Sequence, residues 1–348
     1  MNSGLIKTGL NALYYSGAHA LVSPFCRGIG LIFTLHHVCG QDERPFHPNR
    51  ILEVTPAFLE AVIVEVRRQG YEIVSLDEAH RRIAEPGNEQ PFVCLTFDDG
   101  YRDNRDVAYP ILKKHGCPFA VYVTTSFADG TGALWWLALE EIVREAEHIE
   151  IPFDDGQRGF DPVMPKEQEA AFSEIYWWLR RIDEDRRRQV VATLAERHGV
   201  DMSALCRRQV MSWEELAELA RDPLVTIGAH TVEHKALAKL TEAEARAEIA
   251  DSVTIVGEKL GKVPCHFSFP YGDPGSAGPR EFRLAAEIGL KTAVTTRKGV
   301  IFPEHREHLT ALPRISLNGD FQSPRYVDLY LSGAPFLLWN GFRRMNVA

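Results

Sequence analysis

Acidic and histidine residues follow several apolar segments of the chain. Asp98 and Asp99 come directly after one apolar run, and His230 and His234 come shortly after another. Two imidazoles and one carboxylate can hold a divalent cation and leave coordination positions open for water and a substrate carbonyl. A cation held in this way lowers the pKa of water towards ~7 and polarises the carbonyl. The residue types and their spacing therefore indicate metal-assisted hydrolysis.

Adjacent carboxylates can divide the work of such a site. One of Asp98 and Asp99 can bind the cation, while the other, kept ionised by the positive charge, takes a proton from the water. The ordinary alternatives are that segment 98–100 is a strand-ending turn and that the histidines are surface or core residues. His36 and Tyr271 also follow apolar runs. We favour a catalytic site because all these polar residues stand at such ends in one chain.

Alternating strand-like and helix-like segments must position these groups. Buried strands are predicted at 31–35, 71–74, 92–97, 119–123, 225–228, 266–269 and 292–295. Helices are predicted at 56–68, at 107–115 with an early start or kink at Pro110, at 241–260 behind a capping box, and at 285–289. This alternation predicts an α/β protein with parallel strands, whose C-terminal ends bring the polar residues together.

Three parts of the chain depart from this alternation. The segment from about 132 to 208 is helical with a polar loop near 152–165, and we interpret it as an insertion that walls a substrate groove. Residues 1–30 make a poor signal peptide, so we predict an amphipathic helix that packs on the core or lies on a membrane surface. The tail 320–348 mixes aromatic residues with arginines, which suits docking on the core or at a lipid interface. The segment 31–319 is then the catalytic domain.

The composition limits the function and the location. The 348 residues carry a net charge of -9 and contain no basic footprint, so we expect no nucleic-acid partner. No apolar run approaches the ~18 residues of a spanning helix. The six cysteines form no C-x-x-C pair, so we expect free thiols in a reducing compartment. We therefore expect a cytoplasmic protein that is peripheral to the inner membrane.

The motifs around these residues resemble those of polysaccharide deacetylases, which are carbohydrate esterases with a NodB-homology domain. The segment 96–100 (TFDDG) is similar to the first motif of that family, and the segment 230–234 (HTVEH) to the second, H-[ST]-x-x-H. Pro270 and Tyr271 resemble the end of the third, R-x-P-Y. The resemblance extends over about residues 30–318, and it implies a distorted (β/α) barrel.

The resemblance also implies roles for these residues. Asp99, His230 and His234 would bind one divalent cation, with zinc as the expected metal and cobalt, manganese or nickel as alternatives. Asp98 would be the catalytic base, and the backbone N–H of Tyr271 would bind the developing oxyanion. The implied reaction is hydrolysis of the N-acetyl group of an amino sugar in a polysaccharide or a lipid-linked glycan, with release of acetate.

The third motif departs from the family pattern. In the family it begins with an arginine that orients the catalytic aspartate, whereas this chain has Ser268 at that position. We expect Arg314 to supply the missing positive charge from another strand.

The acid histidine of the family is also not at its usual late position. His305 and His308 stand in a charged, loop-like stretch. The segment 34–38 (TLHHV) instead resembles the Y-H-x-V motif of family members with a permuted strand order. We therefore expect His36, rather than His37 or a late histidine, to protonate the departing amine.

Two tryptophans early in the insertion have two possible roles. Trp135 and Trp136, early in the insertion, either line the groove, since sugars pack on aromatic faces, or anchor the inserted helix.

One alternative function is a deformylase or another amide hydrolase on the same scaffold. The other is a catalytically inactive glycan-binding relative, for which the missing third-motif arginine is the best support.

Overall fold

The structure is a computed structural model that describes residues 3–40 and 42–347. Its strands are β1 (Gly30–Leu35), β2 (His37–Val38), β3 (Glu53–Val54), β4 (Glu72–Ile73), β5 (Phe92–Phe97), β6 (Phe119–Val123), β7 (Ile149–Phe153), β8 (Gly156–Phe160), β9 (Val225–Ala229), β10 (His266–Ser268), β11 (Thr292–Val294) and β12 (Ile315–Ser316). Its helices are α1 (Ser3–Tyr15), α2 (Ala18–Cys26), α3 (Pro56–Arg68), α4 (Leu76–Ala84), α5 (Tyr109–Lys114), α6 (Thr125–Ala128), α7 (Trp135–Glu145), α8 (Pro165–Leu179), α9 (Glu184–Arg197), α10 (Met202–Gln209), α11 (Trp213–Leu219), α12 (Glu242–Leu260), α13 (Pro279–Glu287), α14 (Pro324–Ser332) and α15 (Ala334–Trp339).

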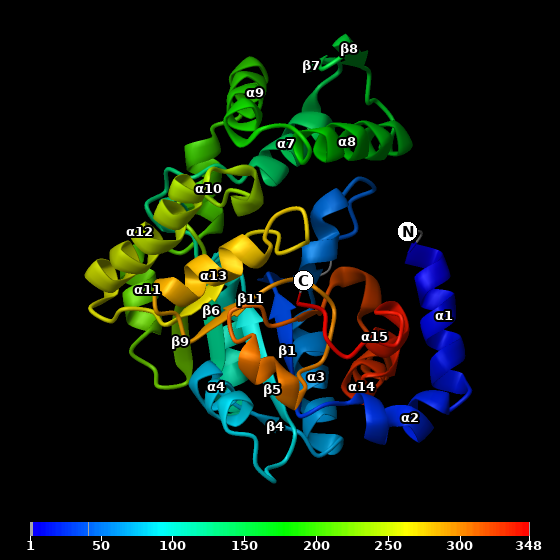
Figure 1. The fold of residues 1–348 in the computed structure, drawn as a ribbon. Coiled ribbons are helices and arrows are strands. Elements are labelled where there is room, and N and C mark those ends of the chain that lie inside the picture. Colours follow the sequence, from blue (N-terminus) through cyan, green and yellow to red (C-terminus); the bar gives the residue numbers. More distant parts are fainter. Residues whose placement is uncertain (1–2, 41, 348) are drawn as a thin grey trace.

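The central sheet consists of parallel strands that are buried on both faces. Every residue of β1, β5 and β6 is buried, which a parallel sheet achieves only when both of its faces are covered. The strand order is β11-β10-β9-β6-β5-β1-β12, with β4 also beside β5. Figure 1 labels β9, β6, β5 and β1 of this sheet. The two ends of this order meet, because Val294 of β11 pairs with Leu312 just before β12. The predicted distorted (β/α) barrel is therefore confirmed.

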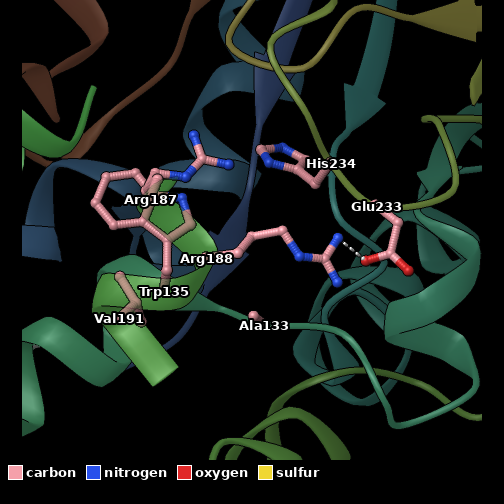
Figure 2. A pocket seen from close by; sticks show the side chains of 7 residues that line it. All are labelled: Ala133, Trp135, Arg187, Arg188, Val191, Glu233 and His234. Carbon is pink, nitrogen blue, oxygen red and sulfur yellow. Dashed lines mark hydrogen bonds and ion pairs between the residues drawn. The ribbon is translucent and has the colours of Figure 1, made fainter. Parts of the chain in front are cut away.

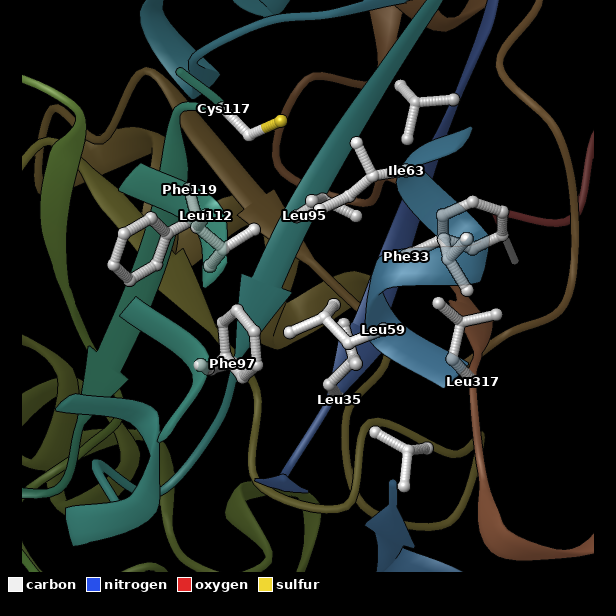
Figure 3. Packing of buried hydrophobic residues seen from close by; sticks show 14 of the residues in the cluster. Phe33, Leu35, Leu59, Ile63, Leu95, Phe97, Leu112, Cys117, Phe119 and Leu317 are labelled. Atoms are coloured by element: carbon white, nitrogen blue, oxygen red, sulfur yellow. The ribbon is translucent and has the colours of Figure 1, made fainter. Parts of the chain in front are cut away.

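Apolar side chains between the sheet and its helices form the main core. Phe33 and Leu95 of the sheet belong to one cluster with Leu59 and Ile63 of α3 (Figure 3). Burial of each such side chain stabilises the fold by roughly 1.5–3 kcal/mol relative to exposure. The amphipathic helix α3 thus holds β1 and β5 in place, and with them the polar residues at their C-terminal ends.

Most predicted elements agree with the structure, and two differ instructively. The helix predicted at 107–115 begins earlier, as a π-helical turn at Asn104–Ala108 that leads into α5. Pro110 then stands in the first turn of α5, where its missing N–H removes no hydrogen bond. The loop predicted near 152–165 is wrong in part, because β7 and β8 form a hairpin there. Gly156 turns it with a φ of 127°, and apolar residues alternate along β7.

The two ends of the chain pack side by side against the barrel. Helices α1, α2, α14 and α15 gather along one side of the molecule (Figure 1). Val327 and Tyr330 of α14 lie in the main core, and the hydroxyl of Tyr71 donates to the carbonyl of Leu331 at 2.6 Å. The tail therefore docks on the core. Among the described residues, no helix is both long and apolar enough to cross a bilayer.

Candidate active site

Asp99, His230 and His234 come together at the C-terminal ends of β5 and β9. Oδ1 of Asp99 lies 3.5 Å from Nε2 of His230 and 3.3 Å from Nε2 of His234. All three residues are buried, and their possible ligand atoms lie within 4.8 Å of one another. Metal–ligand bonds of ~2.1 Å at tetrahedral angles would separate neighbouring ligand atoms by ~3.4 Å. The spacing of these atoms therefore matches a single shared cation.

The hydrogen bonds around this group leave its ligand atoms free. Nδ1–H of His230 donates to the carbonyl of Ser268 at 2.6 Å, which directs the Nε2 lone pair towards Asp99. Burial lowers the pKa of His234 to about 4, so this imidazole is neutral at neutral pH. Oδ1 of Asp99 is buried and has no hydrogen-bond partner among the described residues. An unpaired buried carboxylate oxygen is costly, and a cation would satisfy it. The residues present fit a divalent metal ion.

The backbone is strained around the same group. Asp99, Thr231, His234 and Tyr271 have φ values of 71°, 67°, 53° and 61°, and they are four of the five non-glycine residues with positive φ in residues 3–40 and 42–347. A left-handed conformation costs a residue with a β-carbon about 1–2 kcal/mol. Such strain persists where surrounding contacts enforce it, and it concentrates at functional sites.

Glu248 of α12 supplies one of these enforcing contacts. Its Oε2 accepts the backbone N–H groups of Val232 and Glu233, both at 2.9 Å. The loop that carries both histidines is therefore clamped to a helix. Glu248 did not emerge from the sequence analysis, although it stands with Ala245, Ile249 and Ser252 on the buried face of α12. A carboxylate on an apolar helix face is the signal that could have revealed it.

Asp98 forms a two-fold ion pair with Arg314. Nη1 of Arg314 donates to Oδ1 of Asp98 at 2.7 Å, and Nη2 donates to Oδ2 at 2.6 Å. The same Nη2 also donates to the hydroxyl of Ser268 at 2.8 Å. Burial raises the pKa of Asp98, but the charge and hydrogen bonds of Arg314 outweigh it, so the pKa lies below its ordinary range. The guanidinium thus stands beside Ser268 and reaches the carboxylate from the residue directly before β12.

Replacement of Arg314 by glutamine should destabilise the protein and make it more sensitive to acid. The variant leaves Asp98 buried without its partner, and breaking a buried ion pair costs about 3–5 kcal/mol. In the native protein the pKa of Asp98 is lowered from its ordinary 3.8, so the pair stabilises the fold above that pH and is lost as pH falls through the native pKa. Loss of Arg314 raises this pKa, so acid unfolding should begin at higher pH.

Urea unfolding at a series of pH values measures this effect. Arg314→Lys, which keeps one positive charge, is the matched control and should lose less stability than the glutamine variant. Equal stability of Arg314→Gln and the wild type at every pH would contradict the assignment.

His36 and His37, which follow β1, have different surroundings. His37 is held by Asp103, with 2.6 Å between Nδ1 and Oδ2, and its ring lies 3.6 Å from that of Tyr101. His36 is half-buried, and the described residues give its ring no hydrogen-bond partner. Burial lowers the pKa of His36, and the nearby carboxylates of Asp99 and Asp98 oppose that shift. Of these two histidines, His36 is therefore the one near both carboxylates.

The late histidines are placed differently. His305 is fully buried, and its Nδ1 accepts the N–H of Phe302 at 3.0 Å. Burial lowers its pKa to about 4. His308 is exposed in the same stretch. His305 thus serves as a local cap within its own turn.

A sequence profile of the polysaccharide deacetylase family matches residues 85–293, which is more than half of the chain. This chain belongs to the polysaccharide deacetylase family. The matched range includes Asp98, Asp99, both clustered histidines and Tyr271, whereas His36 and Arg314 lie outside it. The roles of these two residues therefore depend on the geometry above.

Solved structures of deacetylases share the fold of this family member. The Streptococcus pyogenes deacetylase PplD, solved in complex with acetate, is 18% identical with a TM-score of 0.56, over 87% of this chain and 97% of that one. IcaB from Ammonifex degensii is 17% identical with a TM-score of 0.55, over the same shares of the two chains. Likeness at such low identity concerns the fold. YxkH of Bacillus subtilis is 30% identical over 98 residues, which is 28% of this chain and 34% of YxkH. That match spans about a third of the relative.

The insertion contributes one wall of the site in this deacetylase-family chain. A hollow beside His234 is lined by Trp135 of α7 and by Arg187 and Arg188 of α9 (Figure 2). Nε1–H of Trp135 donates to the hydroxyl of Tyr271 at 2.9 Å, which fixes that ring. Both Trp135 and its neighbour are buried and anchor α7 in a second core cluster. Of the two tryptophans, Trp135 alone lines the hollow, and the ring of Trp136 packs 5.1 Å from that of His234.

Arg187 was also missed by the sequence analysis. It is buried with Glu184, and its Nη2 lies 2.5 Å from a carboxylate oxygen of that residue. Glu184, Arg187, Val191 and Leu194 are spaced along one face of α9, and all four are buried. Charged residues on the buried side of an inserted helix are the signal that could have identified them.

The described residues hold one other group that could bind a metal ion, Asp77, Cys265 and His266. Here Nζ of Lys291 lies 2.6 Å from Oδ1 of Asp77, so a lysine ammonium already neutralises this carboxylate. The side chain of Asp77 is also about half exposed, at 49%. The cluster around Asp99 differs in both respects, because it is buried and its carboxylate oxygen has no such partner among the described residues.

Proposed function

We propose that this protein removes the N-acetyl group from an amino sugar in a polysaccharide or a lipid-linked glycan, and that it needs one divalent cation, with zinc as the expected metal. The observation that supports this most is the adjacency of an ionised Asp98 and the cluster of Asp99, His230 and His234. A pure glycan-binding protein would have no use for a buried carboxylate kept ionised by an arginine. We propose a cytoplasmic location in peripheral contact with the inner membrane, and the free cysteine thiols support a reducing compartment.

The chemistry follows from the positions of the side chains. A divalent cation held by Asp99, His230 and His234 would lower the pKa of the attacking water and polarise the amide carbonyl. Asp98 takes the proton of this water. Two oxygens of a carboxylate offer four lone-pair sites, and Oδ1 of Asp98 accepts a single hydrogen bond from the described residues, so it keeps a lone pair for this proton.

The oxyanion and the leaving group are assigned to two further residues. The carbonyl of Pro270 accepts the N–H of Gly272 at 2.7 Å, which closes a tight turn around Tyr271. Within the described residues no hydrogen bond uses the N–H of Tyr271, so this donor is available to the developing oxyanion. The C–N bond then breaks, and His36 in its protonated form gives a proton to the nitrogen. The oxygen of the attacking water becomes part of the released acetate, and the sugar is released with a free amino group.

Replacement of His36 by glutamine should lower turnover of the amide substrate by about 10²–10⁴-fold, because the amine would leave without a proton donor. An activated aryl acetate ester has a leaving group that needs no proton, so its hydrolysis should fall much less. Rates on both substrates measure the difference. His37→Gln is the matched control and should retain most activity on the amide. An equal loss on amide and ester, or a larger loss in the His37 variant, would contradict the role of His36.

A panel of N-acetyl and N-formyl amino sugars, oligosaccharides and lipid-linked sugars tests the proposed function. The purified protein loaded with zinc is incubated with each, and released acetate and formate are measured. The proposal predicts acetate as the main product. Formate as the main product would identify a deformylase, and no released acid from any substrate would favour an inactive glycan-binding relative.

A further inference from the structure

Helices α2 and α15, which lie near opposite ends of the chain and pack against each other, expose large apolar side chains. Leu21 and Phe25 of α2 are 80% and 72% exposed, and Phe342 beyond α15 is 71% exposed. Helix α15 packs against α2, and Gly333 before α15 lies so close that a β-carbon there would stand 2.0 Å from the carbonyl oxygen of Cys26. We call the exposed apolar residues of this region the terminal face: Leu21, Val22, Phe25, Leu338, Trp339 and Phe342.

Helix α2 is inverted compared with an ordinary surface helix. A helix on a soluble protein buries its apolar stripe and exposes polar residues. In α2 the buried residues are His19 and Cys26, and His19 contacts Asp328 with 3.6 Å between Nε2 and Oδ2. Its exposed residues include Leu21, Val22 and Phe25. Packing on the barrel therefore does not explain the apolar character of α2, and a partner outside the protein does.

The charges near the terminal face point to the nature of that partner. The chain as a whole is acidic, with 48 carboxylate and 39 basic residues. Residues 1–41 nevertheless contain no Asp or Glu, and neither do residues 329–348. Arg27, Arg343 and Arg344 in these segments are exposed. An exposed apolar surface with a basic rim complements an anionic bilayer, where apolar side chains enter the interface and arginines meet the headgroups.

We propose that the terminal face docks the protein on the surface of an anionic lipid bilayer. A second copy of this chain is the less suitable partner, because a two-fold contact would bring identical basic residues together. Trp339 suits the membrane–water interface, because its apolar ring lies 3.8 Å from the positively charged Nζ of Lys298. Docking itself does not depend on the proposed function. The further inference that the active site meets a lipid-linked glycan at this surface rests on the proposed function.

Vesicle sedimentation of the full chain tests the docking. The probes are phosphatidylcholine vesicles with or without about one third phosphatidylglycerol, because basic residues respond to anionic lipid. The wild type should bind the anionic vesicles about tenfold more strongly than the neutral ones. Leu21→Ser/Phe25→Ser should weaken binding to both at least about tenfold. Arg343→Gln/Arg344→Gln should weaken binding to the anionic vesicles alone and reduce its dependence on salt.

The matched control is Val163→Ser/Met164→Ser, which removes an apolar pair of the insertion that is 69% and 60% exposed. This variant should bind vesicles as the wild type does. All variants should deacetylate a water-soluble substrate at the wild-type rate, so a failure of docking is distinguishable from a failure of the proposed reaction. Wild-type protein that stays in the supernatant with anionic vesicles would overturn the proposal. So would a Leu21→Ser/Phe25→Ser variant that sediments as the wild type does, or a lipid-free dimer that this variant abolishes.

Discussion

The Asp98→Asn variant should retain one equivalent of zinc and lose turnover by about 10³-fold or more. Asparagine occupies the same volume but cannot take a proton from the attacking water. The three proposed metal ligands are other side chains, so binding of the cation should survive. The measurements are the turnover number on an N-acetylated amino sugar and the zinc content after dialysis.

A control and a stability measurement make this result specific. Asp103→Asn removes a carboxylate that contacts His37 in the same segment, and it should leave turnover within a few-fold of wild type. Asp98→Asn also leaves the guanidinium of Arg314 without its ionic partner, so a loss of stability is expected with the loss of turnover. Activity must therefore be measured below the unfolding range of the variant. Full turnover by a folded Asp98→Asn variant would refute its role as the base.

The His230→Ala variant should lose the cation and the activity together. A site with two protein ligands in place of three binds zinc far more weakly, and His230 is the ligand whose tautomer is set by the carbonyl of Ser268. In the wild type, zinc at about 100 times its Kd should stabilise the fold by about 2.7 kcal/mol, because it binds the native state alone. This zinc-dependent rise in the thermal midpoint should be absent from the variant.

The buried histidine of a neighbouring strand provides the matched control for His230. His266 in β10 is 1% exposed and belongs to the other possible cluster, with Asp77 and Cys265. His266→Ala should therefore keep zinc, activity and the thermal shift, apart from a general loss of stability from the cavity. If His266→Ala loses zinc while His230→Ala keeps it, the metal site is wrongly assigned.

Local patterns in the sequence were sufficient to predict the alternating parallel strands and helices, and the family resemblance implied that they form a barrel. The runs 92–97 and 119–123 are apolar apart from Thr96, and they became β5 and β6 with the same bounds. Helix α3 begins after Thr55, whose hydroxyl accepts the N–H of Phe58, and it runs over the predicted range 56–68. These features depend on neighbouring residues in the chain, which is why reading the sequence can locate them.

The parts that could not be predicted depend on contacts between distant segments. The hydrogen bonds that Glu248 accepts from the loop between the two histidines join α12 to a turn after β9. The sequence of neither segment alone indicates that the two are in contact. The positive φ values at Asp99 and Tyr271 follow from the packing around them, because side-chain chemistry alone disfavours that conformation. The sequence left both a sugar-binding and a core-anchoring role open for Trp136, because the choice depends on how α7 packs. The hairpin of β7 and β8 was hidden by its polar turn residues.

We propose that three side chains from two strand ends share one cation. Anomalous diffraction from crystals soaked in zinc tests it most directly, because it locates the metal independently of activity. One strong peak is expected at about 2.0–2.2 Å from Oδ1 of Asp99 and from Nε2 of His230 and His234. A peak at Asp77, Cys265 and His266 instead, or no peak between Asp99 and the two imidazoles, would contradict it.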